Sequence, residues 1–425
     1  MLRGRRWHCF LGFVALWAVL CTPLAALAAY PAPSRVSVLT MGPGDHPFTR
    51  FGHNAILVEW DEGGPRPDLV FNFGTFSFNG LDGVKDFMEG RFRYWLSVTT
   101  LDATRKVYAA EQRSLTGQLL ALTAAERATL FERLSANAEP DERYYDYDYY
   151  RDNCSTRVRD AVDQLLGGEL HRQINGAGRL TFRQHTLRLV GDTPWLYFGL
   201  DAALGAPTDR PTTRWEELFL PQELHDELAK ATRLLDGRLV PLVQSESSLL
   251  ASERAPLPLA PPERRLPFAL GGLAAGALLA ALGAAAERSR AAHAVFGATT
   301  ALLGGAIGTL GAALTWFSAS KHWAAHQNPT VLGCPPWALA LLVLGVLFAL
   351  SRRAPSRALL GLLGASLLAS LALLVLSLAG VLAPGREALR EALLFTPLWA
   401  GWFGGAWLAC RKSPYVLRQL AASTP

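Results

Sequence analysis

The chain has 425 residues, of which half are apolar and only 18% are charged, and its formal net charge is +5. This length exceeds a single small module, and a mean hydropathy of +0.16 predicts membrane segments. Nucleic-acid binding needs a clustered basic face. Arginines alternate with acidic residues here, so we expect no nucleic-acid partner.

The first 29 residues have the pattern of a secretory signal peptide. Arginines up to Arg6 precede an apolar run, and small residues follow it up to Ala29. A lipidated signal would need a small residue before the cysteine, but Leu20 precedes Cys21. We therefore expect residues 1–29 to direct export of the domain that follows.

Residues 30–254 are predicted to form one extracytoplasmic α+β domain. The turn-forming sequence MGPGDHPFTRFG leads to the strand-like run HNAILVEW, which starts at His53, and a loop then leads to a second run, LVFNFGTF, from Leu69. Residues 255–266 are too rich in proline for a helix and are predicted to be a linker.

Cys154 is the only cysteine of the predicted exported domain. The sequence RDNCSTRVRDAVDQLLGG places apolar residues at helical spacing from Val158 to Leu166, which predicts an amphipathic helix. Asp152 or Asn153 would cap its start. Cys154 would then lie in the first turn, where free N–H groups and the helix dipole favour a thiolate.

A cysteine nucleophile needs a base, and His53 is the best-placed of the five histidines in the domain because it opens a strand. A cysteine at a helix start packed on a strand histidine is the arrangement of papain-like enzymes, here in permuted order. A structural cysteine is the alternative. A zinc site made from Cys154, His53, His46 and Asp152 is disfavoured, because the domain has no CxxC or HxxxH pair, so we expect no metal.

Aromatic residues cluster around both candidate residues. They could form the core of the sheet, or they could line a groove for an acyl chain. The two groups are Phe71, Phe73, Phe76 and Phe78 beside His53, and Tyr144, Tyr145, Tyr147, Tyr149 and Tyr150 beside Cys154.

The region 267–410 is predicted to be an all-α bundle of five transmembrane helices, because five stretches are long and apolar enough to cross a bilayer. The basic loops near Arg290 and Arg353 and the tail 411–425 would all lie on the cytoplasmic side, as the positive-inside rule requires. The outer loops would carry Lys321 and a mixed group at 386–391. The predicted spans are 267–286, 291–319, 329–350, 358–383 and 392–410.

Four sequence blocks resemble, in order, the motifs of the Lnb-type lipoprotein N-acyltransferases: VLTMGPGDHPFTRFGHNAILV, FNFGTFSF, YYDYDYYRDNCSTRVRD and PTTRWEELFLP. The resemblance implies a domain similar to permuted NlpC/P60 enzymes, joined to five membrane helices. It also implies that Cys154 and His53 are catalytic. Asn72, in the second block, is the candidate for a third, orienting group.

The implied reaction moves the sn-2 acyl chain of a diacylglyceryl-cysteine lipoprotein to the α-amino group of the same cysteine, with no cofactor. The partners would be diacylated lipoproteins and the bilayer, and the location the cytoplasmic membrane with the catalytic domain outside. The N–H of Cys154, with Asn153, would bind the oxyanion. Further substrate-binding candidates are Arg157, which could instead pair with Asp152 or Asp160, and Tyr150, His322 and Asn328.

Two other functions remain open from the residues alone. A thiol hydrolase of cell-wall peptide or phospholipid would use the same Cys154 and His53 pair. A non-catalytic membrane accessory protein would carry a structural Cys154, or one paired with Cys334.

Overall fold

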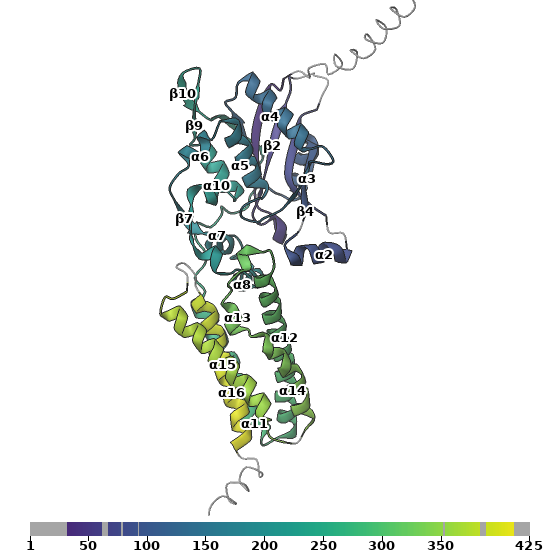
Figure 1. The fold of residues 1–425 in the computed structure, drawn as a ribbon, viewed down its shortest axis with the longest axis vertical. Coiled ribbons are helices and arrows are strands. Elements are labelled where there is room, and N and C mark those ends of the chain that lie inside the picture. The colour runs from purple at the N-terminus through teal and green to yellow at the C-terminus, as the bar shows by residue number, and fades with distance from the viewer. Residues whose placement is uncertain are drawn as a thin grey trace, which may run out of the picture.

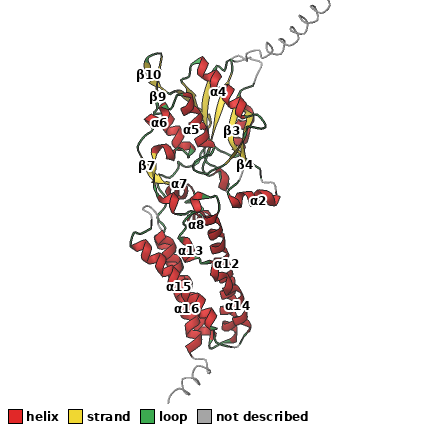
Figure 2. Cartoon of the chain, in the orientation of Figure 1, coloured by secondary structure: helices red, strands yellow, loops and turns green. Residues whose placement is uncertain are grey.

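The structure is a computed structural model that describes residues 32–61, 67–77, 80–91, 93–351, 353–382 and 388–411. The predicted signal peptide and the predicted tail from residue 412 lie outside these ranges. A domain that contains all the strands lies at one end of the long axis, and a bundle of helices lies at the other end (Figures 1 and 2). The predicted α+β class is confirmed.

The exported domain is built on an antiparallel seven-stranded sheet with the order β11-β5-β1-β2-β3-β4-β6. The predicted strands at His53 and Leu69 are confirmed and are neighbours in the centre of the sheet. The strands are β1 (Arg35–Met41), β2 (His53–Glu59), β3 (Leu69–Thr75), β4 (Arg93–Thr100), β5 (Leu115–Leu120), β6 (Tyr144–Asp146) and β11 (Val243–Leu250).

Side chains alternate across the sheet and form two cores. Ile56 and Phe71 face a core completed by Leu130 of α4 and Val158 of α5. The opposite face packs against the start of α3 through Leu101. These helices are α3 (Leu101–Ala110), α4 (Ala124–Asn137) and α5 (Cys154–Leu165). Because side chains alternate with period two, β1, β2, β3, β5 and β11 each contribute to both cores.

Shorter elements surround the sheet and fill the space towards the bundle. The helices are α2 (Gly80–Glu89), α6 (Glu169–Gln173), α7 (Phe182–Leu189), α8 (Pro194–Ala203), α9 (Arg214–Glu217) and α10 (Pro221–Leu228). Two small hairpins complete the domain: β7 (Ala177–Thr181) with β8 (Pro211–Thr213), and β9 (Thr232–Leu235) with β10 (Arg238–Pro241). In Figure 1, α2, α7 and α8 lie between the sheet and the bundle.

Five helices or helix pairs of the bundle are long and apolar enough to cross a membrane, as predicted. The third is broken, because α13 ends before Cys334 and Pro335 interrupts the backbone hydrogen bonding. The elements are α11 (Arg265–Ala286), α12 (Arg290–Ala319), α13 (Thr330–Gly333), the 3₁₀ helix η4 (Pro336–Leu339) with α14 (Ala340–Leu350), α15 (Arg357–Leu378) and α16 (Ala388–Arg411).

Glycines allow close contact between the helices of the bundle. A Cβ atom on Gly276 of α11 would lie 2.2 Å from the carbonyl oxygen of Pro397 in α16, and one on Gly308 of α12 would lie 2.2 Å from the Leu339 nitrogen. Membrane helices associate through such small residues because lipid provides no hydrophobic driving force between them.

A loop between α12 and α13 fastens the bundle to the exported domain. Trp323 donates its indole N–H to the Asp148 carboxylate, and the guanidinium of Arg151 lies 3.6 Å from the centre of the Trp323 ring. The Gly205 N–H donates to the Ala324 carbonyl at 2.6 Å. These contacts tie the loop to the segment that leads into α5 and to the end of α8.

A buried ion cluster makes the second connection. Arg183 of α7 pairs with Asp209 at 2.6 Å and with Asp201 of α8 at 3.0 Å, and Asp201 also pairs with Arg390 of α16 at 2.9 Å. All four side chains are at most 2% exposed. The sequence analysis placed Arg390 in an outer loop with other charges. This was wrong, because α16 begins at Ala388 and Arg390 is buried against α8.

We predict that Arg390→Ala destabilises the protein by about 3–5 kcal/mol, because it leaves the Asp201 charge buried and only partly paired. Denaturant unfolding of the full chain in detergent would measure the change. Lys106→Ala is the matched control, since Lys106 pairs with Asp102 where both side chains are 76% exposed, and such surface pairs contribute about 0–1 kcal/mol. Equal effects of the two variants would contradict a structural role for the cluster.

Candidate active site

Cys154 is the first residue of α5, as predicted. Asn153 is the N-cap, and its Oδ1 accepts the Thr156 N–H at 2.9 Å, while Thr156 Oγ1 accepts the Asn153 N–H at 2.8 Å. Cys154 is 8% exposed and belongs to the core between α5 and the sheet. This capping box fixes the first turn of the helix and therefore the direction of the thiol.

The thiol lies where β2 and β3 separate. Their pairing ends at Ile56 and Phe71, although both strands continue towards His53 and Thr75. Gly74 has φ +89°, and a Cβ atom there would lie 3.5 Å from the Cβ of Cys154. A side chain at position 74 would be strained by this φ and would crowd the nucleophile.

The backbone N–H groups of Asn54, Cys154 and Ser155 lie close to the Cys154 sulfur and lower the pKa of the thiol. Burial opposes them and is the larger effect, so the pKa of Cys154 is raised above its ordinary value. The expectation that the helix start favours a resting thiolate is therefore corrected. The thiol is neutral at rest and needs a base.

The same N–H groups are candidate donors to an oxyanion formed beside the sulfur. Asn153 is not among them, because its polar groups have other partners. Its N–H is bonded to Thr156, and its side-chain amide donates to the carbonyls of Tyr149 and Phe219, both at 2.9 Å. Asn153 therefore holds the helix start in place.

His53 opens β2 next to Asn54, whose N–H lowers the pKa of the thiol. Burial is the main reason that the pKa of His53 falls to about 4, and the charge of Arg113 lowers it further. A hydrogen bond with the Asn72 side chain acts in the opposite direction. The imidazole is therefore neutral near pH 7 and able to accept a proton.

Asn72, the candidate third group, lies on β3 and hydrogen-bonds to His53. Its Nδ2 donates to the Val70 carbonyl at 3.3 Å. The contribution of Asn72 raises the pKa of His53, as expected if the amide oxygen accepts an imidazole N–H. Asn72 is therefore placed to orient the base, which is the role of the third residue in a catalytic triad.

Arg113 is a site residue that the sequence analysis missed. It is 3% exposed, and its Nε donates to the Gly42 carbonyl at 2.7 Å, while Nη1 pairs with Glu111 at 2.9 Å. Its Nη2 is buried with no hydrogen-bond partner among the described residues. The charge lowers the pKa of both His53 and Cys154. No local motif marks Arg113, because strand pairing between β1 and β5 brings it to this end of the sheet.

Tyrosines surround the thiol. The position of a Cβ on Gly74 is 3.5 Å from Cys154, 3.8 Å from the Tyr147 ring and 3.9 Å from the Tyr145 hydroxyl, so both rings adjoin Cys154. Tyr147 also stacks on Tyr94 at 3.9 Å. Burial raises the pKa of Tyr147, and the neighbouring Cys154 raises it further.

Tyr150 has a different position. Its hydroxyl bonds to Thr186 Oγ1 at 2.9 Å, and its ring packs between Phe182 and Phe219. It is buried in a separate core. The structure therefore gives Tyr150 a packing role in this core, and its role in substrate binding stays a prediction.

The remaining candidates also make structural contacts. The guanidinium of Arg157 forms a two-bond salt bridge with the carboxylate of Asp152, which is one of the alternatives that the sequence analysis left open. It also lies over the Tyr145 ring, 4.1 Å from the ring centre. His322 Nε2 bonds to the Phe87 carbonyl at 2.6 Å, and Asn328 donates to the Ala202 carbonyl at 2.6 Å. The last two therefore dock the α12–α13 loop, and their polar groups do not face Cys154.

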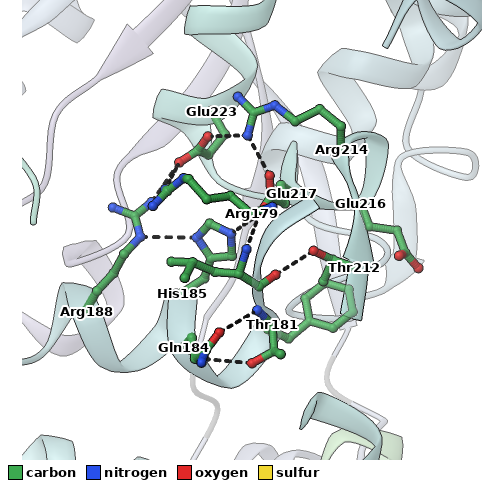
Figure 3. Close-up of polar contacts among 12 residues, drawn as sticks. Arg179, Thr181, Gln184, His185, Arg188, Thr212, Arg214, Glu216, Glu217 and Glu223 are labelled. Carbon is green, nitrogen blue, oxygen red and sulfur yellow. Dashed lines mark hydrogen bonds and ion pairs between the residues drawn. The ribbon is translucent and has the colours of Figure 1, made fainter. Parts of the chain in front are cut away.

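The PTTRWEELFLP block contributes Glu217 and Arg214 to a network of polar contacts with His185 (Figure 3). Glu217 accepts hydrogen bonds from His185 at 2.7 Å and from Arg214 at 2.6 Å, and it is fully buried. The next two residues carry the contact to α5, because the Leu218 carbonyl accepts the Ser155 hydroxyl at 2.6 Å and the Phe219 carbonyl accepts the Asn153 amide. The network thus fixes the position of the first turn of α5, and therefore of Cys154, relative to the sheet.

Two alternatives from the sequence find no support in this geometry. Cys154 and Cys334 are both free thiols, so they are not paired with each other. Within the described ranges, no three histidine, cysteine, aspartate or glutamate side chains come together as metal ligands.

Residues 24–190 match the family model of the Lnb N-terminal periplasmic domain. This part of the chain is therefore similar to the Lnb family. The match includes His53, Asn72 and Cys154 and ends at Val190, before the bundle. No curated protein and no solved structure matches the chain. With its five apolar helices, the chain is a multi-pass membrane protein with an Lnb-type periplasmic domain.

The pKa values predict an unusual acid limit for activity. A base must be neutral to accept a proton, so the rate should fall only as the pH drops through about 4, the pKa of His53, and not near the ordinary value of about 6.5. Arg113→Met removes a charge that lowers this pKa and should therefore move the acid limit upwards. The pH dependence of kcat/KM would measure both effects.

Arg105→Met is the control, since Arg105 is an exposed arginine on α3. It should leave the profile unchanged. A wild-type limit near pH 6.5, or an unchanged limit in Arg113→Met, would contradict this electrostatic account of His53.

Proposed function

We propose that the chain is a lipoprotein intramolecular N-acyltransferase. It would move the sn-2 acyl chain of a diacylglyceryl-cysteine to the α-amino group of the same cysteine and so produce a lyso-form lipoprotein. The observation that carries the proposal is a thiol at the start of a helix in an Lnb-type domain, packed on a strand that begins with a neutral histidine.

The first half of the reaction forms a thioester. The Cys154 sulfur attacks the sn-2 carbonyl carbon while His53 accepts the thiol proton. The N–H groups of Asn54, Cys154 and Ser155 stabilise the oxyanion. The C–O bond then breaks, and His53 returns the proton to the glycerol oxygen, which leaves as a hydroxyl.

The second half transfers the acyl group to nitrogen. The α-amine attacks the thioester carbonyl, His53 accepts a proton from the amine, and the C–S bond breaks. His53 then returns the proton to Cys154. One ester becomes one amide within the same molecule, so no water, second lipid or cofactor is consumed.

The resting charges favour a general-base mechanism. The thiol pKa is raised and the imidazole pKa is about 4, so both groups are neutral before the attack. The proton therefore moves as the sulfur attacks. This order suits an ester substrate, because the imidazolium that forms is the acid required by the leaving glycerol oxygen.

The fold and the location support the proposal in general terms. A helix-start cysteine packed on a strand that begins with histidine corresponds to a permuted NlpC/P60-like arrangement, which we propose for this domain. The bundle would hold the site at the surface of the cytoplasmic membrane. An ester at the lipid headgroup level is accessible only to a site fixed at that height.

Purified full-length protein with a diacylated lipopeptide in detergent, without phospholipid, tests the reaction. We expect a product of unchanged mass whose fragments contain an N-acyl group and a monoacylglyceryl thioether. A product one acyl chain lighter with free fatty acid would indicate a hydrolase. A heavier product that forms only with phospholipid would indicate a different acyl donor. Either result would overturn the proposal.

Cys154→Ser and His53→Ala should each reduce the transfer rate by at least about a hundredfold, since general-base catalysis contributes about 10²–10⁴-fold. Cys334→Ser is the matched control, because Cys334 is a buried free cysteine of the bundle. It should retain wild-type activity. Full activity in either site variant would exclude that residue from the mechanism.

A further inference from the structure

A series of aromatic rings connects the membrane bundle with the exported domain. We call Phe317, His322, Phe87, Tyr149 and Tyr147 the aromatic track. Its ring centroids are separated by 5.4 Å from Phe317 to His322, 6.5 Å from His322 to Tyr149, and 5.5 Å from Tyr149 to Tyr147. Phe87 of α2 lies alongside, 5.7 Å from His322 and 6.5 Å from Tyr149.

The two ends of the track lie at functionally different places. Phe317 belongs to α12, a candidate membrane span, and is two residues from its end. Tyr147 adjoins Cys154 at Gly74, where the strands separate. The track therefore runs without a break from the end of a membrane helix to the candidate nucleophile.

The rings retain accessible surface. Tyr149 is 39% exposed, and the other four members of the track are partly exposed. Rings that served only to join the two parts of the protein would be buried by each other. A part-exposed row of aromatic faces can instead contact a flexible apolar chain along its length.

We propose that the aromatic track binds the acyl chain that is transferred and guides its ester from the bilayer surface to Cys154. This proposal rests on the proposed function and adds the route by which its substrate enters. The occupant is a long fatty acyl chain, because one end of the track lies at a membrane span and each of its rings has a face that an apolar chain can contact. Binding along the track would place the carbonyl carbon, at the end of the chain, beside the thiol.

The test compares substrates of different chain length with the full-length protein. Tyr149→Ser and Phe87→Ser should lower kcat/KM at least about tenfold for a long-chain diacylated lipopeptide, because each removes apolar contact with the chain. The same lipopeptide with short acyl chains, which would not reach these rings, should react at the wild-type rate. Tyr144→Ser is the matched control, since Tyr144 is 37% exposed and packs against Trp95, outside the track.

A second measurement uses a long-chain lipopeptide with a photoreactive group on its sn-2 acyl chain and the Cys154→Ser variant, which prevents turnover. We expect labelled peptides that contain Tyr147, Tyr149 or His322. Labelling elsewhere, or equal loss with long and short chains, would overturn the track. If the wild-type protein transfers no acyl group, the proposed function fails, and the labelling pattern alone then decides whether the track binds an acyl chain.

Discussion

The buried ion cluster of Arg183, Asp201, Asp209 and Arg390 determines how the exported domain sits on the membrane bundle. Charges removed from water are tolerated only when they are paired, and Asp201 pairs at once with an arginine of α7 and an arginine of α16. Any tilt of the domain would separate these pairs. The height of the site above the membrane therefore follows from this contact, together with the docked loop at Trp323.

The second constraint is the balance of burial and hydrogen bonding at Cys154. Backbone N–H groups favour the thiolate, but burial among tyrosines outweighs them. His53 is subject to the same balance, and the charge of Arg113 also disfavours its protonated form. Both groups thus remain neutral until a substrate is in place. A buried neutral thiol is also less exposed to oxidation, which follows thiolate character and access.

The four motif blocks have two kinds of role. Those with His53, Asn72 and Cys154 provide the groups that would carry out the chemistry, whereas PTTRWEELFLP provides support. Glu217 lies at the centre of its network, and the following carbonyls fix Asn153 and Ser155. Asn153, Tyr150, Arg157 and Asn328 each have a hydrogen-bond partner inside the fold.

The local sequence pattern was sufficient to predict those helices and strands whose stabilising residues lie close together in the sequence. The strand at His53, the helix at Cys154 and the five apolar spans follow from periodicity and capping, which act within a few residues. The motifs also indicated the two principal site residues. Tertiary structure alone decided the rest. Arg113 reaches the site because β5 pairs with β1, Arg390 is buried because α16 meets α8, and the pKa values depend on burial by residues distant in the chain.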